Sequence, residues 1–300
     1  NVSMDEHYAG ICGITKEELL DHMSDDINAL ANKLQLSREE TIQKLVENYD
    51  GYHFCWPSPD VFNPYSLLNC FAKQKLGDFW FGSGTPTYLI QLMRKYDLLP
   101  SNLKPTQAKA SAFDAPTEQL KSLTPLMYQS GYTTIKGYDA EMDLYTLDIP
   151  NKEIKVGLFE CLLPNYLGDD TEQGEVVIAK MSLLIRKGEI NAALQLLADF
   201  METVPYCENT HYEGHYQQML YVIFALLTDY NIGVEQHTAK GRIDITLETT
   251  ETIYVMELKF NKSADEALRQ IAANRYSDAF KLKGKEIVKV GLNFCVKDGV

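Results

Sequence analysis

The sequence predicts an α/β protein of the α+β type, with a mostly helical first part and, in its last part, a mixed β-sheet flanked by helices. Three observations support this prediction. Through most of residues 1–125 the signals are those of helices, namely apolar spacing and capping residues. Within residues 234–261, positions 243–248 instead alternate apolar and polar side chains, and after a polar turn positions 253–258 are largely apolar, which predicts two strands. Helical patterns at residues 212–229 and 264–276 stand on either side of that stretch.

Two capping boxes mark where the first helices begin. Thr15 is followed three residues later by Glu18, and Ser37 by Glu40. In such a pair each side chain accepts a hydrogen bond from the other residue's backbone N–H group, which satisfies donors that the first helical turn leaves open. We expect the helices of this part at residues 16–34, with a break near Ser24, and at residues 38–48, 65–75 and 87–96.

A loop with two glycines precedes the last of these helices. Its residues, GSGTPT at positions 82–87, depart from the phosphate-binding pattern G-x-G-x-x-G at the last position. The other phosphate-loop pattern, G-x-x-x-x-G-K-[ST], is absent from the sequence. We therefore interpret the loop as a structural turn that caps the next helix, and we expect no ATPase activity from this chain.

Prolines at positions 100, 105 and 116 predict a linker before the middle of the chain. We expect the elements that follow at residues 117–130 (helix), 132–135 and 143–147 (hairpin), and 156–166, 172–186 and 189–201 (helices). Helix, hairpin and helix in this order predict a winged-helix-like connector. Because its composition is acidic, packing against protein is favoured over the reading of DNA.

The negative charge lies mainly in the first two of three predicted domains, which are residues 1–115, 116–205 and 206–300. Residues 1–205 hold 17 Lys and Arg against 29 Asp and Glu, whereas residues 206–300 hold 11 against 13. The net charge of −14 disfavours nucleic-acid binding by bulk electrostatics, but the last domain is near neutral. A local basic rim there can include Lys240, Arg242, Lys259, Lys262, Arg269 and Arg275.

Cysteine usage and hydropathy predict a cytoplasmic protein. The six cysteines are scattered without a C-x-x-C motif, as expected for reduced core residues. Residues 1–15 lack the basic start and apolar region of a signal peptide. The longest apolar run, residues 219–227, is far shorter than the roughly 18 residues that a membrane span needs, so we expect no membrane partner.

Three charged residues interrupt the predicted strands of residues 234–261. Glu257 and Lys259 stand two apart in an otherwise apolar strand and so point to the same face. If the strands form a hairpin, Asp244 lies near the part of its strand that faces Glu257. Two carboxylates offer a hard oxygen site for Mg²⁺, and a nearby lysine can orient water or offset charge on a phosphate. The alternative is a solvated edge strand with Glu257 and Lys259 as an ordinary surface pair.

The order of these elements resembles the PD-(D/E)xK nuclease superfamily. More narrowly, TAKGRIDITLETTETIYVMELKF followed by SADEALRQIAANRY resembles the nuclease domain attached to bacterial AAA-ATPase-like proteins. The resemblance implies a restriction-endonuclease-like sheet in which Asp244 and Glu257 bind Mg²⁺ or Mn²⁺. It further implies that Lys259 is the catalytic lysine and that Gln270 is an accessory residue on the next helix.

Glu213 lies between two histidines at the start of the helix predicted for residues 212–229. His211 and His215 are four residues apart, a spacing found in zinc sites, but no third ligand is evident and H-E-x-x-H is not matched. In the resembled nuclease fold, Glu213 is the acidic residue of the first helix and can contact the metal. An acidic residue at a helix start is equally well explained by the helix dipole.

The first part of the chain carries a second resemblance. CGITKEEL, YDGYHF, FNPYSLLN and FWFGSGTPTYLI are similar to the C-terminal, helical part of the AAA-ATPase-like domain, a lid-like region. This implies that the nucleotide-binding core, with its Walker motifs, lies before Asn1 and that the chain is a fragment of a longer protein.

These expectations converge on a metal-dependent nuclease that forms the effector end of an AAA-ATPase-like protein. Asp244, Glu257, Lys259 and Gln270 are the expected catalytic residues, and nucleic acid, DNA ahead of RNA, is the expected partner. Two alternatives remain open at this point. The domain can be a catalytically silent module that docks or binds for an ATPase, or it can be purely structural.

Overall fold

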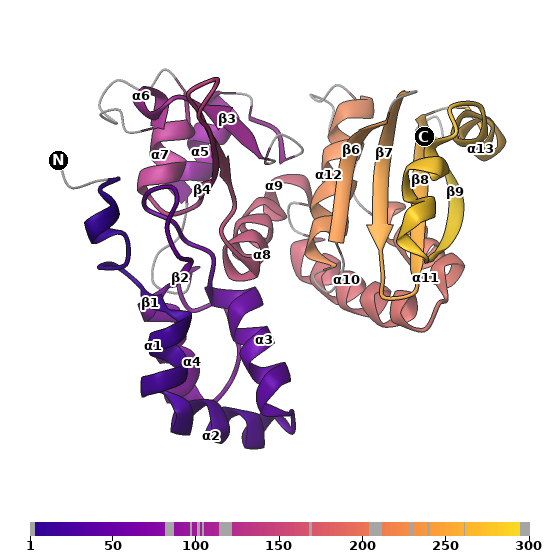
Figure 1. Cartoon of the computed structure of the whole chain (residues 1–300). Helices are drawn as coiled ribbons and strands as arrows, with labels where there is room; N and C mark the ends of the chain where they lie inside the picture. Colours follow the sequence, from indigo (N-terminus) through magenta and orange to yellow (C-terminus); the bar gives the residue numbers. More distant parts are fainter. Residues whose placement is uncertain are drawn as a thin grey trace. The chain divides into compact units, whose positions relative to one another are not determined.

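The computed structural model describes residues 4–81, 87–96, 98–100, 103, 105–113, 122–167, 170–203, 212–227, 231–238, 241–260 and 262–294. The chain divides into two compact units, Asn1–Cys161 and Leu162–Val300. Both contain helices and strands (Figure 1), which confirms the predicted α+β class. The boundary between the units falls inside residues 116–205, for which the sequence predicts a connector.

Helices dominate the start of the first unit. The elements are η1 (Glu6–Tyr8), α1 (Lys16–His22), α2 (Ser24–Leu34), α3 (Arg38–Tyr49), α4 (Pro64–Lys73) and α5 (Thr87–Lys95). Both predicted capping boxes are present, since the backbone N–H groups of Thr15 and Ser37 donate to Glu18 and Glu40 at 2.8 Å. The predicted break is also confirmed, because Met23 separates α1 from α2.

The helices α1 to α4 enclose an apolar core. Its buried members are Leu19, Ile27, Leu30, Leu45, Tyr49, Phe62, Leu67, Cys70, Phe71 and Phe79. Tyr49 is among the largest fully buried side chains of the described residues, and its hydroxyl donates to the carbonyl oxygen of Gly77 at 3.0 Å. The short strands β1 (Ile14–Thr15) and β2 (Val61–Phe62) pair antiparallel in the same unit.

A three-stranded antiparallel sheet forms the rest of the first unit, with the strand order β3-β5-β4. Its strands are β3 (Thr106–Ala108), β4 (Thr134–Asp139) and β5 (Leu144–Asp148), and its helices are α6 (Ala110–Phe113), α7 (Thr124–Gln129) and α8 (Lys152–Leu162). The predicted hairpin is therefore confirmed. The sequence did not predict β3, which lies inside the proline-containing linker. Of the helix expected at residues 117–130, residues 117–121 fall outside the described residues and α7 forms part of the rest.

The second unit contains a four-stranded mixed sheet. Its helices are α9 (Pro164–Leu167), α10 (Thr171–Arg186), α11 (Ile190–Met201), α12 (Tyr212–Leu226), α13 (Ala264–Ala273) and η6 (Tyr276–Lys283). Its strands, in spatial order, are β6 (Asn231–Thr238), β7 (Gly241–Glu248), β8 (Thr252–Phe260) and β9 (Glu286–Phe294). The first three form an antiparallel meander, whereas β9 runs parallel to β8 after the crossover through α13.

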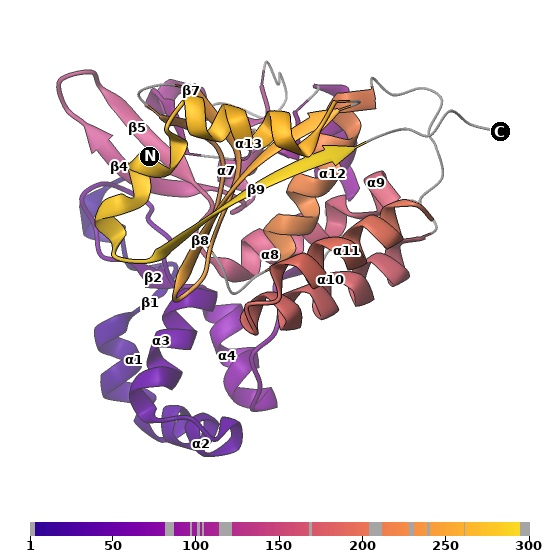
Figure 2. The same cartoon turned by 90° about the vertical axis from the view of Figure 1, so that its right-hand side faces the viewer.

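Both faces of this sheet are covered at its central strand. Residues 253–257 of β8 are all buried, and successive residues of a strand point to opposite faces. On one face Ile253 and Val255 form a cluster with Ile271 of α13 and with Tyr276 and Phe280 of η6. Figure 2 shows α13 and β9, in yellow, on the near side of this unit. In the described ranges, no helix is both long enough and apolar enough to cross a membrane.

In the first unit, a loop after α3 joins the helical layer to the three-stranded sheet. Asp50 is buried, and its Oδ1 accepts the Gly51 N–H at 2.8 Å. The Lys136 ammonium of β4 donates to the Gly51 carbonyl oxygen, and the Asn151 amide donates to the Asp50 carbonyl oxygen at 3.0 Å. Gly51 has φ +97°, a left-handed conformation that favours glycine. Burial raises the pKa of the Asp50 carboxyl to about 6.

We predict that Asp50→Asn stabilises the protein increasingly as the pH rises from 4 to 7. Native Asp50 keeps its proton up to a higher pH than the unfolded chain does, so the parent loses stability across this interval. Asparagine does not titrate and can still accept the Gly51 N–H. The difference in free energy of unfolding should therefore grow by about 2 kcal/mol. Urea unfolding at both pH values measures it, and parallel pH profiles would contradict it.

Candidate active site

The strand β8 carries a buried carboxylate. Its sequence, TIYVMELKF, is apolar except at its first residue and at Glu257 and Lys259, and Glu257 is only 2% exposed. Burying a carboxylate alone is costly, so a partner is expected. The Lys259 Nζ atom lies 2.9 Å from Glu257 Oε1, and the Lys259 side chain is 13% exposed. The same-face position of these two residues, two apart on the strand, explains this contact.

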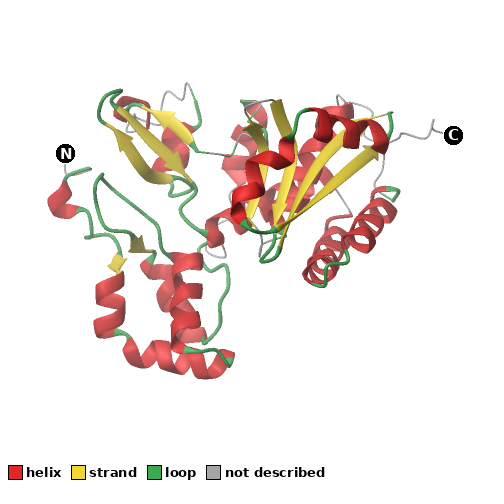
Figure 3. Cartoon of the chain, turned by 45° about the vertical axis from the view of Figure 1, so that its right-hand side comes forward, coloured by secondary structure: helices red, strands yellow, loops and turns green. Residues whose placement is uncertain are grey.

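The described pairing between β7 and β8 ends next to the residues that the sequence analysis predicts to form the site. The ladder between β7 and β8 runs from Glu248–Ile253 to Ile245–Met256, and its described pairs end there. In contrast, β6 pairs with β7 as far as Gly241, and β9 pairs with β8 as far as Phe260. Asp244 and Glu257 are the next residues beyond the Ile245–Met256 pair. They therefore stand at the fork of the sheet, whose strands fan apart in Figure 3.

The other end of the sheet is closed by ion pairs. Glu248, at the end of β7, lies 2.9 Å from the Lys285 ammonium and also pairs with Lys283. Lys285 in addition donates to the Thr249 carbonyl oxygen at 2.7 Å. The hydrogen bond from Lys283, reinforced by Lys285, holds the pKa of the Glu248 carboxyl below its usual range. Ion pairs and a hydrogen bond therefore hold the sheet together at the β7–β8 turn, whereas the described β7–β8 pairs end at Ile245–Met256 on the other side.

A glycine in β9 allows the helix α13 to pack closely against the sheet near Glu257. Gly291 of β9 is the parallel partner of Glu257, and a methyl group there would overlap the backbone carbonyl oxygen of Ala264. The same methyl group would come within 3.0 Å of the Leu268 side chain. Glycine at this position therefore permits the first turn of α13 to contact the sheet next to Glu257. Gln270 lies on this helix and is partly buried.

The structure places the five predicted site residues as follows. Glu257 and Lys259 are in contact, and Gln270 is on the helix that covers their face. Asp244 is in β7 and Glu213 is in α12, but their side chains are outside the described part, as is all of His211. Among the side chains that are described, no three His, Cys, Asp or Glu residues gather as a metal would require. The side chains of Asp244 and Glu213 are not among those described.

Two further residues at the fork were not singled out from the sequence. One is Gly291, although an isolated glycine in a strand pattern indicates a close approach of another segment. The other is Asn293, the parallel partner of Lys259, whose Oδ1 accepts the Lys262 N–H at 3.0 Å and so holds the chain just after β8. No pattern in the sequence indicates this contact, because it joins residues on different elements.

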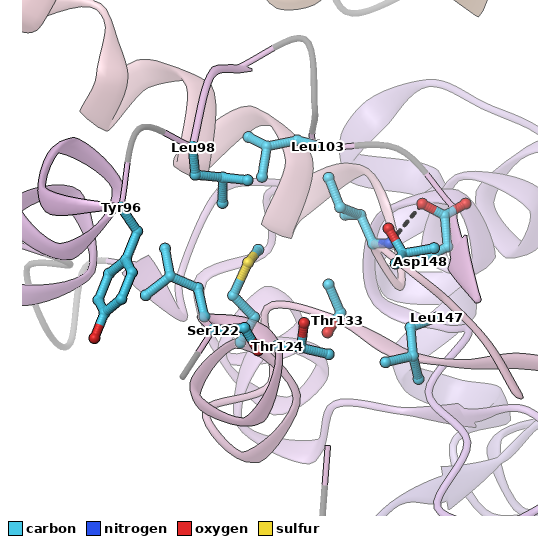
Figure 4. A pocket seen from close by; sticks show the side chains of 12 residues that line it. Tyr96, Leu98, Leu103, Ser122, Thr124, Thr133, Leu147 and Asp148 are labelled. Atoms are coloured by element: carbon cyan, nitrogen blue, oxygen red, sulfur yellow. Dashed lines mark hydrogen bonds between the residues drawn. The ribbon is translucent and has the colours of Figure 1, made fainter. Parts of the chain in front are cut away.

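Two cavities are lined by described residues of the first unit. One, of about 270 Å³, has mainly apolar walls that include Leu98, Leu103 and Leu147 (Figure 4), and the Asp148 carboxylate at its edge accepts the Ile149 N–H at 2.8 Å. None of its described lining residues is Lys, Arg or His. The other, of about 560 Å³, has His53 as its only basic lining residue among those described. Neither cavity offers the cationic side chains that a phosphate group would need.

The comparisons with known proteins agree with the geometry of the second unit. A sheet with a buried carboxylate and a lysine at its fork, covered by a helix, fits a nuclease-like domain. Residues 211–300 match the family model described as PD-(D/E)XK nuclease superfamily, and this part of the chain is a domain of that superfamily.

One curated relative resembles the whole chain. It is described as "Uncharacterized protein in vnfD 5'region" from Azotobacter chroococcum mcd 1 and is 29% identical over 306 residues. The match covers 98% of this chain and 56% of the relative, so the chain spans little more than half the length of that protein. No solved structure matches the chain.

We predict that Gly291→Ala loosens α13 from the sheet. The added methyl group meets a backbone carbonyl, which cannot move as a flexible side chain can, so we expect a loss of about 1–3 kcal/mol in the free energy of unfolding. Amide hydrogen exchange should become faster in α13 and β9. Gly137→Ala in β4 is the matched control, because its methyl group would meet nothing closer than 3.7 Å. Equal exchange in parent and Gly291→Ala would contradict the prediction.

Proposed function

We propose that the protein hydrolyses phosphodiester bonds in nucleic acid with the help of a divalent metal ion, Mg²⁺ or Mn²⁺, held by Asp244 and Glu257. One observation carries the proposal: a carboxylate that is 2% exposed lies 2.9 Å from a lysine ammonium at the fork of a sheet in a nuclease-superfamily domain. A core strand gains nothing from this pair by packing, because apolar residues of similar volume stabilise such positions at least as well.

The residues at the fork suit a hard cation. Carboxylate oxygens are the ligands that Mg²⁺ and Mn²⁺ prefer, and Glu257 supplies one from a fixed strand position. Asp244 would supply a second from the facing strand, and Glu213 of α12 is a further candidate contact. A bound divalent ion would activate water and stabilise negative charge on the phosphate.

Lys259 and the metal ion depend on the same carboxylate. Without metal, the Lys259 ammonium is held by Glu257 Oε1. If Glu257 served as a metal ligand, this attraction would weaken and the ammonium would be available to the phosphate or to the attacking water. Lys259 would then orient the water and offset charge that develops on the phosphate. Gln270, on the helix over this face, would hold Lys259 or the phosphate in position.

The wider setting of this activity follows from the resemblance of the first part of the chain. We propose that the nuclease-like domain is the effector end of a bacterial AAA-ATPase-like protein, and that DNA is its substrate ahead of RNA. The four cysteines that the structure describes have free thiols, which supports a reducing, cytoplasmic location.

A binding module without turnover is the second candidate. The chain has 42 acidic against 28 basic residues, and Lys262, near the fork, is engaged with Glu266 at 3.5 Å. A nuclease that bound nucleic acid through a broad basic face would carry more Lys and Arg than Asp and Glu on that face. On this alternative, the domain docks a partner for an ATPase and the Glu257–Lys259 pair remains closed.

We predict that Glu257→Ala abolishes both Mn²⁺ binding and metal-dependent cleavage while the fold remains. Loss of the ligand should reduce cleavage by at least about 100-fold. The measurements are titration calorimetry with Mn²⁺ and cleavage of single- and double-stranded DNA and of RNA. Glu266→Ala, which removes a half-exposed carboxylate on α13, is the matched control and should leave both unchanged. Equal cleavage by Glu257→Ala and parent would assign the activity to another site or to contamination.

We predict that Lys259→Met abolishes cleavage but keeps or strengthens Mn²⁺ binding. The substitution removes the cation that competes with the metal for Glu257. Because it also leaves a buried carboxylate without its partner, the metal-free protein should lose about 3–5 kcal/mol of stability, and Mn²⁺ should restore more stability than it gives the parent. Lys262→Met is the control. If cleavage persists in Lys259→Met, the lysine is not catalytic; if no preparation cleaves any substrate, the binding-module alternative is favoured.

A further inference from the structure

The strand β7 contains a buried hydroxyl group that forms no hydrogen bond with any described residue. Thr246 is 3% exposed, and its Oγ1 has neither a donor nor an acceptor within range in the described part of the chain. A buried hydroxyl without a partner is less favourable than a paired one, so it calls for an explanation. Valine has the same shape and would fill the position in a strand without this cost.

The ladder places this hydroxyl beside the fork. Thr246 is the antiparallel partner of Val255, and directly opposed residues of two strands point to the same face. Glu257 follows Val255 by two positions in the strand and so shares that face. Thr246 is therefore the diagonal neighbour of Glu257, at a spacing of roughly 7–8 Å between backbones, which one water molecule or a side-chain rotation can bridge.

We propose that Thr246 is a positioning residue of the metal site. Its hydroxyl donates a hydrogen bond to an oxygen of the metal's ligand shell, made up of carboxylates and water, and so fixes the orientation of Glu257 when the ion is bound. This inference rests on the proposed function. It explains why this buried hydroxyl has no hydrogen-bond partner among the described residues: the acceptor would be an oxygen of the ligand shell, which is present only when the ion is bound. Residues that orient metal ligands in this way typically change metal affinity by 10–100-fold.

A purely structural role makes a different prediction. If Thr246 only fills space under α13, valine should replace it with a gain in stability and no effect on metal. If Thr246 orients the ligand shell, valine should still stabilise the metal-free protein, because an unpaired hydroxyl is removed, but the variant should bind metal less tightly. Stability and metal affinity then change in opposite directions, a signature that loss of folding cannot produce.

The experiment measures urea unfolding without metal and Mn²⁺ binding by titration calorimetry for the parent, Thr246→Val and Thr246→Ser. We expect Thr246→Val to raise the urea midpoint and weaken Mn²⁺ binding about tenfold. Thr246→Ser keeps the hydroxyl and should bind Mn²⁺ within about twofold of the parent, even if the lost methyl group lowers the midpoint. Thr133→Val is the matched control, because Thr133 Oγ1 in the first unit is also buried without a partner among the described residues.

Each outcome decides one question. Unchanged Mn²⁺ affinity in Thr246→Val, with binding intact in the parent, overturns the role of Thr246 and leaves the proposed function standing. Equal weakening by Thr246→Val and Thr133→Val also overturns it, because the effect would not be local. Absence of Mn²⁺ binding in the parent, or equal binding by the parent and Glu257→Ala, overturns the proposed function and this inference with it.

Discussion

A carboxylate inside a core strand constrains the whole second unit. Glu257 is tolerated there because Lys259, two residues later, reaches back to it on the same face. A slip of one residue in the β7–β8 register would turn both to the opposite face and expose apolar side chains in exchange. The register is fixed at the turn, where Thr249 and Thr252 exchange hydrogen bonds and Glu248 binds two lysines. Polar contacts at the turn thus fix the face of the sheet on which Glu257 and Lys259 lie at the other end.

The predicted site residues Asp244 and Glu257 lie directly beyond the last described pair between β7 and β8. Where β7 and β8 are paired, most of their side chains are apolar, and Ile253 and Val255 pack against α13 and η6. Where the pairing ends, the next residues are acidic. The described core of this sheet thus ends next to the predicted site residues, and Gly291 allows the covering helix to reach that transition.

Local patterns in the sequence were sufficient for most elements. Capping boxes at Thr15 and Ser37 located helices because their hydrogen bonds join neighbours in sequence. Alternation located β7, and an apolar run after a polar turn located β8, for the same reason. The strand β3 was missed because three residues carry no period and are ordered only by pairing with β5, far along the chain. The end of the β7–β8 ladder and the approach of Ala264 to Gly291 were likewise invisible, since both depend on how distant elements meet. The roles of Asp244, Glu257, Lys259, Gln270 and Glu213 remain predictions.

The order in which the strands join has a consequence for folding. The β7–β8 pair closes through the short connection from Glu248 to Thr252, and hairpins of this kind form in about 1–10 μs. Pairing of β9 with β8 is parallel and must wait for the crossover through α13 and η6, a non-local and slower event. Asp244 and Glu257 can thus approach each other in a meander that is not yet covered. If these two residues bind a divalent ion as proposed, an ion in the refolding buffer would reach them before the last strand docks, and would accelerate the collapse of this unit rather than only stabilise its end point.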